Sequence, residues 1–460
     1  MRRLRIRYWP LAAAAMSSGL LACGPWQRVG TEPVADPNVF VPRLFDAPGI
    51  YEGMGLFAAR DPLPFVAGMR FLAGADPDST LAVFGLSLAN KSLSFRRAGP
   101  VFEARYRVEL SFRREGRVIR QASADETVRV ASFMETQRSD ESVIFQQLVA
   151  LPPGPVLAVI SLRDRFGTGF SRADGTVVVP RFGLGPALSG LVPVFYGGAR
   201  AARAEVPDIV VNPRATAAYG SDTLTFYLEG YGITDGQLVT LRALAREEAD
   251  QEVWRDTVTL AATATLGAVV VRVEPEQVPV GELRFEAFFP GGADTARTAA
   301  LVSFSDQWVV ANFDETLFLL RYFGQEAALQ RMQDAPVEQR PELWRAFWQA
   351  TDPNPHTPEH EALDQYFRRL QEANERFREA SEAGWLTDRG EVFITLGEPD
   401  EIFDSSSDLQ GRGVRFIRWT YIGERLTLDF VDETGFGRFR LTSASRSDYL
   451  QVLNRIRRSS

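Results

Sequence analysis

Cysteine, histidine and lysine are nearly absent from this sequence of 460 residues. The single cysteine, Cys23, excludes an intramolecular disulfide. The two histidines, His356 and His360, lie close together in one short segment, far along the chain from Cys23. A serine or cysteine nucleophile that uses a histidine base needs the two side chains next to each other. Because no histidine lies outside this short segment, and because Cys23 is expected to be acylated, serine–histidine–aspartate and cysteine–histidine mechanisms are nearly excluded.

The sequence also lacks the short motifs that bind nucleotides or position a catalytic serine. It contains no Walker-type loop, no Rossmann fingerprint and no serine nucleophile elbow. Its formal net charge is −8, and its basic residues are almost all arginine, with Lys91 as the one lysine. A nucleic-acid partner requires a concentrated cationic face. We therefore expect no nucleic-acid partner, and no motif points to a cofactor.

Long apolar runs are confined to the N-terminus. The first seven residues include Arg2, Arg3, Arg5 and Arg7, and the apolar stretch Tyr8–Ala22 follows them. It holds roughly 15 residues, whereas a membrane-spanning helix needs about 20. The stretch ends in LLAC at Cys23, which resembles a bacterial lipobox. We interpret residues 1–22 as a lipoprotein signal peptide and Cys23 as the acylated residue. The alternative is an ordinary secretory signal with a cysteine nearby by chance.

The residues after Cys23 indicate how the protein is attached. Gly24 rather than an aspartate follows the cysteine, and by resemblance to such signals this favours the outer membrane. No later run is long and apolar enough to replace the acyl chains, so we expect them to be the only membrane anchor. Residues 23–49 are rich in proline, glycine and aspartate, which predicts a flexible tether.

Strand patterns dominate the sequence from about residue 50 to residue 305. In VFEARYRVELSF, apolar residues from Phe102 to Phe112 alternate with polar ones, which predicts a strand with one buried face. The RREGR sequence then predicts a hairpin, and LPPGPVLAVISLRD predicts a turn followed by a strand. DTLTFYLEGYGI has the same alternation, so Tyr227 and Glu229 are expected on a solvent-exposed face. We predict two tandem all-β sandwich-like (Ig-like) domains, at residues 50–185 and 205–305.

The hydrophobic period changes at about Ser305. DETLFLLRYFG, EAALQRMQ and PELWRAFWQAT place apolar residues three and four apart, which predicts helices. A longer helix is expected to start with Thr357 as N-cap and Pro358 in its first turn, and to end at Gly384 in the left-handed conformation. Its apolar stripe comprises Leu363, Phe367, Leu370, Ala373, Phe377 and Ala380. EVFITL, VRFIRWTY, RLTLDFV and GRFRLT then predict strands. Residues 306–450 should form an α+β domain, with helices packed on a small, mainly antiparallel sheet.

The sequence GWLTDRGEVFITLGEPDEI, from Gly384 to Ile402, concentrates turn residues. In a structural interpretation, each polar or glycine residue shapes a turn and Trp385 covers a helix–sheet junction. Thr387 and Asp388 would satisfy backbone groups, and Gly390 would supply a positive φ before a strand. Gly397 and Pro399 would make the next turn, and Asp400 would cap a helical turn that begins at Glu401.

A functional interpretation of the same segment remains open. Asp388, Glu398, Asp400 and Glu401 could meet at one end of the sheet, as an acid/base pair or as ligands for Ca²⁺. Glycan hydrolysis would need two carboxyl groups flanking a cleft, with Trp385 or Trp419 exposed as a sugar platform. His356 and His360 are weak candidates for Zn²⁺ ligands. We favour the structural interpretation, because turns require aspartate, glycine and proline in any case.

The segment also resembles the signature of the GWxTD domain, a bacterial family named for that pentapeptide. Gly384, Trp385, Thr387 and Asp388 fit the name, and Arg389-Gly390 continues as the family usually does. The upstream RAFWQATDPNPHTPEHEALDQYFRRLQEANERF and the downstream RWTY and LDFVDETGFGRFRL are also similar to it. The likeness covers roughly residues 310–445 and departs at His360, where an asparagine is expected.

The resemblance implies an exported envelope protein with N-terminal β-domains, since VVNPRATAAYGSDTLTFYLEGY is similar to the β-rich region that precedes this domain. It carries no established catalytic residues. We therefore expect a non-enzymatic envelope lipoprotein that acts as a structural or protein-interaction scaffold for an envelope protein partner. The alternative is a carboxylate-dependent hydrolase of envelope glycans or peptides, with its site at the acidic turns.

Overall fold

The computed structural model of the chain describes residues 47–138, 142–183, 185–220, 222–245, 250–263, 266–292, 294–303, 309, 312–357, 360–379, 382–405 and 415–459. The expected signal peptide, Cys23 and most of the expected tether lie outside these ranges, as do Pro358 and Ala380. Within the described residues, no helix is both long enough and apolar enough to cross a membrane. The first described element is the helix α2 (Ala47–Gly53), which the sequence pattern did not predict.

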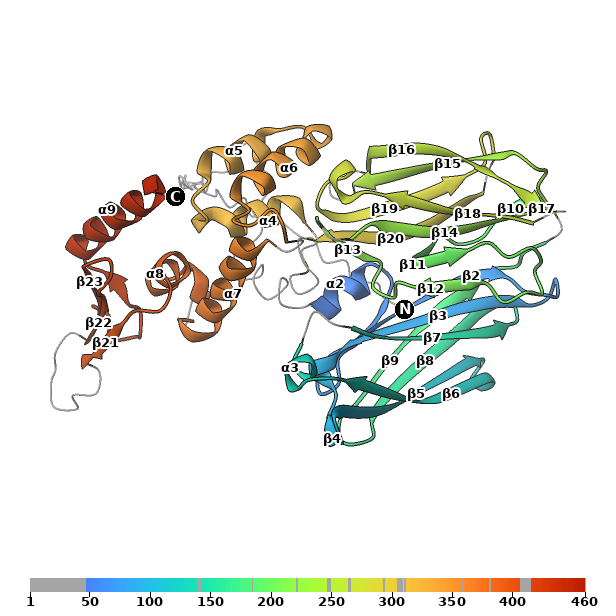
Figure 1. Cartoon of the computed structure of the whole chain (residues 1–460), viewed down its shortest axis with the longest axis horizontal. Coiled ribbons are helices and arrows are strands. Elements are labelled where there is room, and N and C mark those ends of the chain that lie inside the picture. Colours follow the sequence, from blue (N-terminus) through green and yellow to red (C-terminus); the bar gives the residue numbers. More distant parts are fainter. Residues whose placement is uncertain are drawn as a thin grey trace, which may run out of the picture. The chain divides into compact units, whose positions relative to one another are not determined.

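Two antiparallel sheets share one hydrophobic core in the first β-rich region, here called the first sheet pair (Figure 1). One sheet has the order β1 (Phe57–Ala59), β2 (Phe65–Ala73), β3 (Thr80–Ala89), β7 (Ser142–Leu151). The other has the order β4 (Arg96–Ala98), β5 (Val101–Arg114), β8 (Gly154–Asp164), β9 (Phe170–Val179), with β6 (Arg117–Val130) paired to β5. Short helical segments lie at Asn90–Ser92 and at α3 (Phe133–Thr136).

The predicted hairpin is confirmed in β5 and β6. Glu115 and Gly116 turn the chain with φ angles of 50° and 78°, and the two strands pair antiparallel along almost their whole length. On β5 the alternating apolar residues from Ala104 to Phe112 are all buried. The period-two pattern therefore identified both the strand and its inward face.

The second sheet pair also encloses a core between two sheets. One sheet has the order β12 (Asp208–Val211), β11 (Val192–Gly198), β14 (Leu224–Tyr231), β18 (Leu266–Val273), β17 (Ala262–Thr263), with β10 (Ala187–Leu188) on β14. The other has the order β13 (Thr216–Ala218), β20 (Thr295–Ser303), β19 (Gly281–Phe288), β15 (Gln237–Ala245), β16 (Gln251–Leu260), and only its β13–β20 pairing is parallel. A short 3-10 helix spans Pro275–Gln277.

The two sheet pairs repeat one strand order. In the first pair, β2-β3-β7 face the sheet β6-β5-β8-β9. In the second pair, β11-β14-β18 face the sheet β16-β15-β19-β20. The seven strands of each pair are numbered here in chain order: β2, β3, β5, β6, β7, β8, β9 in the first pair, and β11, β14, β15, β16, β18, β19, β20 in the second. In both pairs, strands 1, 2 and 5 form one sheet, and the other sheet has the spatial order 4-3-6-7.

The expectation that β14 has a solvent-exposed face is wrong. Tyr227 and Glu229 are both 0% exposed. Tyr227 packs in a cluster with Leu72 and Val83, which belong to the first sheet pair. The Glu229 carboxylate accepts two hydrogen bonds from the guanidinium group of Arg200, at 2.7 and 2.9 Å. Period two correctly gave a strand, but a neighbouring sheet covers its second face, and a paired charge can be buried there.

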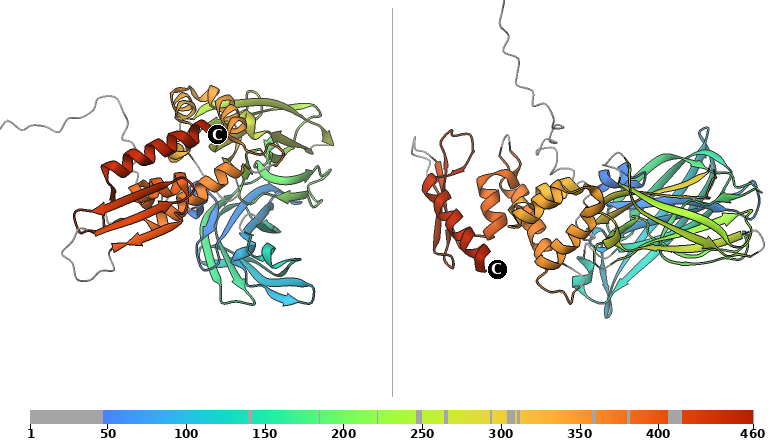
Figure 2. Two further views of the ribbon diagram at one scale, coloured as in Figure 1. Left: turned by 60° about the vertical axis from the view of Figure 1, so that its left-hand side comes forward. Right: turned by 90° about the horizontal axis from the view of Figure 1, so that it is seen from above.

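The C-terminal region consists of helices and a small antiparallel sheet (Figures 1 and 2). Its helices are α4 (Phe313–Leu319), α5 (Glu326–Asp334), α6 (Arg340–Thr351), α7 (Glu361–Arg376), α8 (Asp388–Leu396) and α9 (Ser443–Ser459), with 3-10 turns η3 (Leu320–Tyr322), η4 (Val337–Gln339) and η5 (Gly384–Leu386). The sheet order is β21 (Glu401–Asp404), β22 (Arg415–Tyr421), β23 (Leu426–Asp432), β24 (Arg440–Leu441). This α+β arrangement confirms the predicted class of the region.

Several local predictions in this region are wrong. EVFITL forms the helix α8 rather than a strand, and GRFRLT contributes only the two residues of β24. The long helix α7 begins after His360 and ends at Arg376, so Thr357 is not its N-cap and Gly384 does not end it. The sequence pattern also did not predict the helix α9. Short apolar runs do not distinguish a buried helix from a buried strand, and α8 buries Val392, Phe393 and Ile394 in succession.

Candidate functional site

The GWLTDRG segment forms a tight joint between α7 and α8. Gly384 opens the 3-10 turn η5 and does not have a positive φ, in contrast to the left-handed conformation expected of it. A Cβ atom added to Gly384 would lie 2.3 Å from the carbonyl oxygen of Ala373, near the end of α7. Glycine is needed here because two backbone segments are in contact, not because of an unusual dihedral angle.

Trp385 anchors this joint in the core. Its side chain is 0% exposed. It makes edge-to-face contacts with Phe318 and Tyr322, with ring centroids 5.6 and 6.4 Å apart, and the guanidinium carbon of Arg321 lies 4.9 Å from the indole ring. Burial is confirmed, but these partners lie on α4 and η3, so the ring fills a helix–helix junction rather than the expected helix–sheet junction.

Thr387 starts α8. Its hydroxyl group accepts a hydrogen bond from the Gly390 backbone N–H at 3.1 Å and donates one to the Gly384 carbonyl at 2.8 Å. This is the N-cap geometry that begins a helix. Gly390 lies inside α8 and has no positive φ, so the role expected for it before a strand is wrong.

Asp388 binds the end of the chain to the joint. Its carboxylate accepts a hydrogen bond from the Leu441 backbone N–H of β24 at 2.7 Å and forms a 2.7 Å ion pair with Arg446 of α9. Arg446 also pairs with Glu391, one turn further along α8, at 3.0 Å. Both carboxylates lie in the first turn of α8, where negative charge is favoured by the helix dipole. Asp388 therefore connects the start of α8 to β24 and α9, which are distant in sequence, rather than satisfying backbone groups of its own turn.

A second ion-pair cluster lies beside the first. The Glu379 side chain is 0% exposed and contacts Arg389 and Arg440, each at 3.4 Å, and it accepts a hydrogen bond from the Phe439 backbone N–H at 3.1 Å. Arg440 also pairs with Glu382. Burial lowers the pKa of Arg389, while Glu379 opposes that change. Sequence reasoning missed Glu379, Arg440 and Arg446, because their pairing depends on segments far apart in the chain.

The second acidic turn is also occupied by internal contacts. Gly397 ends α8 with φ 85°, as a turn there requires. Glu398 pairs with both terminal nitrogens of Arg376, and these hydrogen bonds outweigh desolvation and lower the pKa of Glu398. The Asp400 carboxylate accepts a hydrogen bond from the Ile422 backbone N–H at 2.6 Å. After Pro399 the chain enters the strand β21, so Asp400 does not cap a helical turn at Glu401.

The two histidines have different environments. His356 is exposed, and His360 is 2% exposed. His360 is the N-cap of α7, with Nδ1 accepting from the Leu363 backbone N–H at 3.2 Å and Nε2 lying 3.0 Å from the Thr351 hydroxyl oxygen. Burial lowers the pKa of His360, whereas Asp352 and Glu361 raise it. Both ring nitrogens have protein partners, and nothing brings His356 to the same point.

These contacts favour a structural role for the motif. Among the described residues, no group of three or more histidine, cysteine, aspartate or glutamate side chains is arranged to hold a metal ion. Asp388 and Glu398 are paired with arginines, and Asp400 is bound to a backbone N–H. Trp419 is only 2% exposed, and Trp385 is fully buried, so neither ring offers a platform for a sugar.

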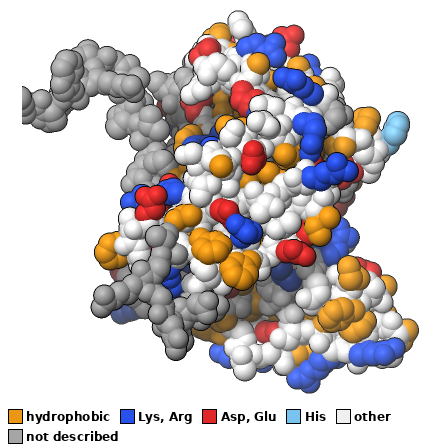
Figure 3. Space-filling model, turned by 90° about the vertical axis from the view of Figure 1, so that its left-hand side faces the viewer, with side chains coloured by type: hydrophobic (Ala, Val, Ile, Leu, Met, Phe, Trp, Pro, Cys, Tyr) orange, Lys and Arg blue, Asp and Glu red, His pale blue; other side chains and the backbone are white. Residues whose placement is uncertain are grey.

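One edge of the small sheet, formed by β21, carries exposed apolar side chains near the motif. Among the described residues, β21 pairs only with β22. Its two central side chains, Ile402 and Phe403, are 51% and 58% exposed. On the face shown in Figure 3, acidic and basic side chains are interspersed with hydrophobic ones rather than segregated. The sequence EIFD gave no sign of this exposure, because a short apolar pair is normally assigned to the core.

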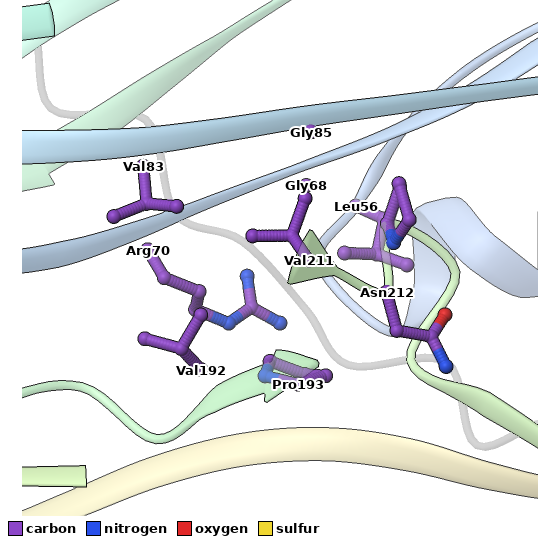
Figure 4. A pocket seen from close by; sticks show the side chains of 10 residues that line it. Leu56, Gly68, Arg70, Val83, Gly85, Val192, Pro193, Val211 and Asn212 are labelled. Carbon is purple, nitrogen blue, oxygen red and sulfur yellow. The ribbon is translucent and has the colours of Figure 1, made fainter. Parts of the chain in front are cut away.

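A small cavity lies between the two sheet pairs. Arg70 of β2 extends into it among Val192, Pro193 and Val211 (Figure 4). Its guanidinium group donates hydrogen bonds to the Thr298 hydroxyl oxygen at 3.0 and 3.2 Å, and desolvation lowers the pKa of Arg70 to about 10. The cavity volume is about 10 Å³, which is about enough for a single water molecule. This point is a joint between sheets rather than a ligand site.

Comparison with known proteins identifies one domain. Residues 292–430 match the model of the GWxTD domain. The match begins just before β20, the last strand of the second sheet pair, and ends within β23, before β24 and α9. No curated protein sequence matches the chain.

Solved structures show only distant similarity. Red sea bream transglutaminase shares 8% identity over 51% of this chain and 31% of its own, with a TM-score of 0.16. An adhesin from Mobiluncus mulieris shares 10% identity over 52% of this chain and 98% of the adhesin chain, with a TM-score of 0.13. Escherichia coli alpha-2-macroglobulin shares 12% identity over 52% of this chain and 22% of the macroglobulin chain, with a TM-score of 0.14. The chain thus spans less than a third of the transglutaminase, and TM-scores this low establish no shared fold.

Proposed function

Because the chain carries a GWxTD domain, we propose that it is an envelope scaffold whose C-terminal domain binds a protein partner along β21. In this proposal, lipid on Cys23 attaches the protein to the outer membrane, and the sheet pairs hold the domain away from the anchor. The lipobox-like LLAC sequence and the strand-rich region after it support this arrangement.

The exposed edge strand is the observation that carries the proposal. A strand at a sheet edge presents unpaired backbone N–H and C=O groups, and proteins usually protect such an edge. Here the edge residues Ile402 and Phe403 are apolar and more than half exposed. A partner strand that pairs with β21 would satisfy the backbone groups and cover both side chains, which is a common mode of peptide recognition.

The same geometry gives little support to the hydrolase alternative. Hydrolysis of a glycan needs two carboxyl groups that flank a cleft and remain available to substrate. Asp388, Glu398 and Asp400 instead stabilise contacts between α8, β22, β24 and their neighbours. The arginines that pair with Asp388 and Glu398 would have to be displaced before either carboxylate could act as a base.

We further propose that the two sheet pairs are tandem immunoglobulin-like sandwiches. Their repeated strand order supports this, because three strands of one sheet and four strands of the other follow the same order in both pairs. The parallel β13–β20 pairing adds a short strand at the edge of the second pair. An experimental structure in which the two sheet pairs had different strand orders would remove the support for a tandem repeat.

The test of partner binding uses the full-length protein in its native membranes. Ile402 and Phe403 are both replaced by lysine, which disfavours pairing at an edge. The matched control replaces Val118 and Ile119 by lysine, since they are also exposed apolar neighbours on an edge strand. After crosslinking and capture, we expect wild type and the control to retain the same crosslinked protein, and the β21 variant to lose it. Equal recovery from all three proteins would contradict a partner site at β21.

A further inference from the structure

A second cavity is lined by the first sheet pair and by Val309, which lies within the residues that match the GWxTD domain. Its walls come from α2, β1, β2 and β3, from Lys91, and from Arg214 in the loop between β12 and β13. The cavity volume is about 190 Å³. A cavity of about 150 Å³ is large enough to bind benzene in another protein, so this space accommodates a small organic group rather than water alone.

The cavity lining includes two cationic side chains and buried polar atoms that lack a hydrogen-bond partner among the described residues. Lys91 and Arg214 both line it, and the described lining includes no carboxylate. The Arg214 Nε atom and the Ser87 hydroxyl oxygen are buried and have no hydrogen-bond partner among the residues that the structure describes. Leaving a buried donor unsatisfied costs about 1–3 kcal/mol, and more for a charged group. Such atoms therefore need an explanation, and an acceptor bound in the cavity would provide one.

Most of the other lining residues are apolar. Phe65 and Ala89 are among them, together with proline, alanine and valine side chains from α2, β1 and β2 and their flanking segments. Phe65 is 2% exposed, so this part of the lining belongs to the core of the sheet pair. An inorganic ion could pair with the cations but would leave this apolar surface uncovered.

We propose that this cavity binds a carboxylate that carries a small branched apolar group. The carboxylate would accept hydrogen bonds from Arg214 Nε and Ser87 and pair with the two cations, while the apolar group would cover Phe65 and Ala89. Pairing of this kind is among the stronger hydrogen bonds in proteins, because donor and acceptor are both ionised. The ligand is either a free carboxylic acid or the C-terminal carboxylate of a peptide. The site is independent of β21 and of the partner proposed there.

Four probes distinguish the sources of the carboxylate. They are isovalerate, the dipeptide acetyl-alanyl-leucine, the C-terminal amide of that dipeptide, and inorganic phosphate. Calorimetric titration into the full-length protein should show saturable binding of one or both carboxylates, with Kd of about 1 mM or tighter. Binding of isovalerate alone identifies a free acid, and binding of the dipeptide alone identifies a peptide C-terminus. Equal binding of the amide or of phosphate, or saturable binding by neither carboxylate, overturns the proposal.

Variants test whether binding takes place at this cavity. Arg214→Gln should weaken binding about tenfold, because it removes a charged donor. Lys91→Gln should have a smaller effect, about threefold, because Lys91 is exposed and its charge is screened by water. The matched control is Arg97→Gln, an exposed arginine that does not line the cavity, and it should bind like wild type.

A steric variant separates loss of binding from loss of charge. Ala89→Leu adds a large side chain to the cavity lining and keeps both cations, so we expect it to abolish binding. The thermal unfolding midpoint of each variant without ligand is measured in parallel, and variants that unfold early are left out of the comparison. Unchanged affinity in Arg214→Gln and in Ala89→Leu, both folded, would show that any observed binding occurs elsewhere.

Discussion

A Cβ atom added to Gly390 would lie 2.0 Å from the carbonyl oxygen of Gly384. The two glycines of the motif are therefore in direct backbone contact, where the first turn of α8 crosses the 3-10 turn that precedes it. The Thr387 hydroxyl group holds the same two backbones together from the side. Glycine, threonine and glycine form one compact unit, and Trp385 projects from it into the core.

This contact predicts the effect of a methyl group. Gly390→Ala should destabilise the protein by about 3 kcal/mol, the upper part of the usual range for overpacking, because the opposing atom belongs to the backbone and cannot rotate away. Gly423→Ala is the control, since nothing lies within 4 Å of its added Cβ. Urea unfolding of both variants beside wild type measures the difference. Equal stability of the two variants would mean that the α8 joint is looser than this contact implies.

Trp385→Ala should destabilise the protein by about 3–5 kcal/mol, the cost of truncating a buried aromatic side chain. Asp400→Asn should cost about 1 kcal/mol or less, because an asparagine oxygen can still accept the hydrogen bond from Ile422 N–H. Thermal unfolding of both variants checks the comparison. A Trp385→Ala variant that melts like wild type would show that the ring is not part of the core.

His360 predicts a pH dependence between pH 7 and pH 5. Its Nδ1 accepts the Leu363 N–H, so protonation of the ring would remove this cap. Burial lowers the pKa of His360 below 6.5 in the folded state. The unfolded chain therefore takes up the proton first, and the contribution to stability is complete above pH 6.5 and declines as the pH falls below it.

The variant His360→Asn tests this dependence. Asparagine is a good N-cap and does not titrate, so its free energy of unfolding should change less between pH 7 and pH 5 than that of wild type. His356→Asn is the control, since His356 is exposed, and it should keep the dependence of wild type. Identical pH profiles for wild type and His360→Asn would exclude this mechanism.

The buried pair Arg200–Glu229 stabilises the contact between the sheet pairs. Arg200 also donates a hydrogen bond to the Ala73 carbonyl at 2.8 Å, which connects β2 to β14. Glu229→Gln leaves the buried arginine without a counter-charge and should cost about 3–5 kcal/mol. Glu252→Gln breaks a more exposed pair with Arg255 and should cost less than about 1 kcal/mol. Similar losses in both variants, measured by urea unfolding, would contradict the special role of the buried pair.

Cys23 predicts the mode of membrane attachment. Cys23→Ala should leave the protein exported but released from membranes, because it is the only cysteine available for acylation. Fractionation after a high-salt wash measures the distribution, with Ser18→Ala as a control that keeps the cysteine. A Cys23→Ala protein that stays with the membrane fraction would argue for attachment through protein contacts.

The sequence by itself determined those features that depend on neighbouring residues. Alternation along Val101–Arg114 gave a strand and its buried face, and the turn residues Glu115 and Gly116 gave the hairpin. Apolar residues three and four apart predicted α4, α5 and α6, and the part of the α7 stripe from Leu363 to Ala373. The GWxTD resemblance rested on several separate motifs, and the family match at residues 292–430 confirms it.

Only the tertiary structure decided the features that depend on segments far apart in the chain. Val392–Ile394 reads equally well as a strand, and it is helical because the Thr387 cap and the contact at Gly390 start a helix there. Glu229 is buried because another sheet lies over β14 and Arg200 reaches its carboxylate. The carboxylate of Asp388 is held by Leu441 and Arg446, more than fifty residues away. Local sequence fixes the period of an element, but the partners of a buried charge are supplied by whichever distant segment the fold places beside it.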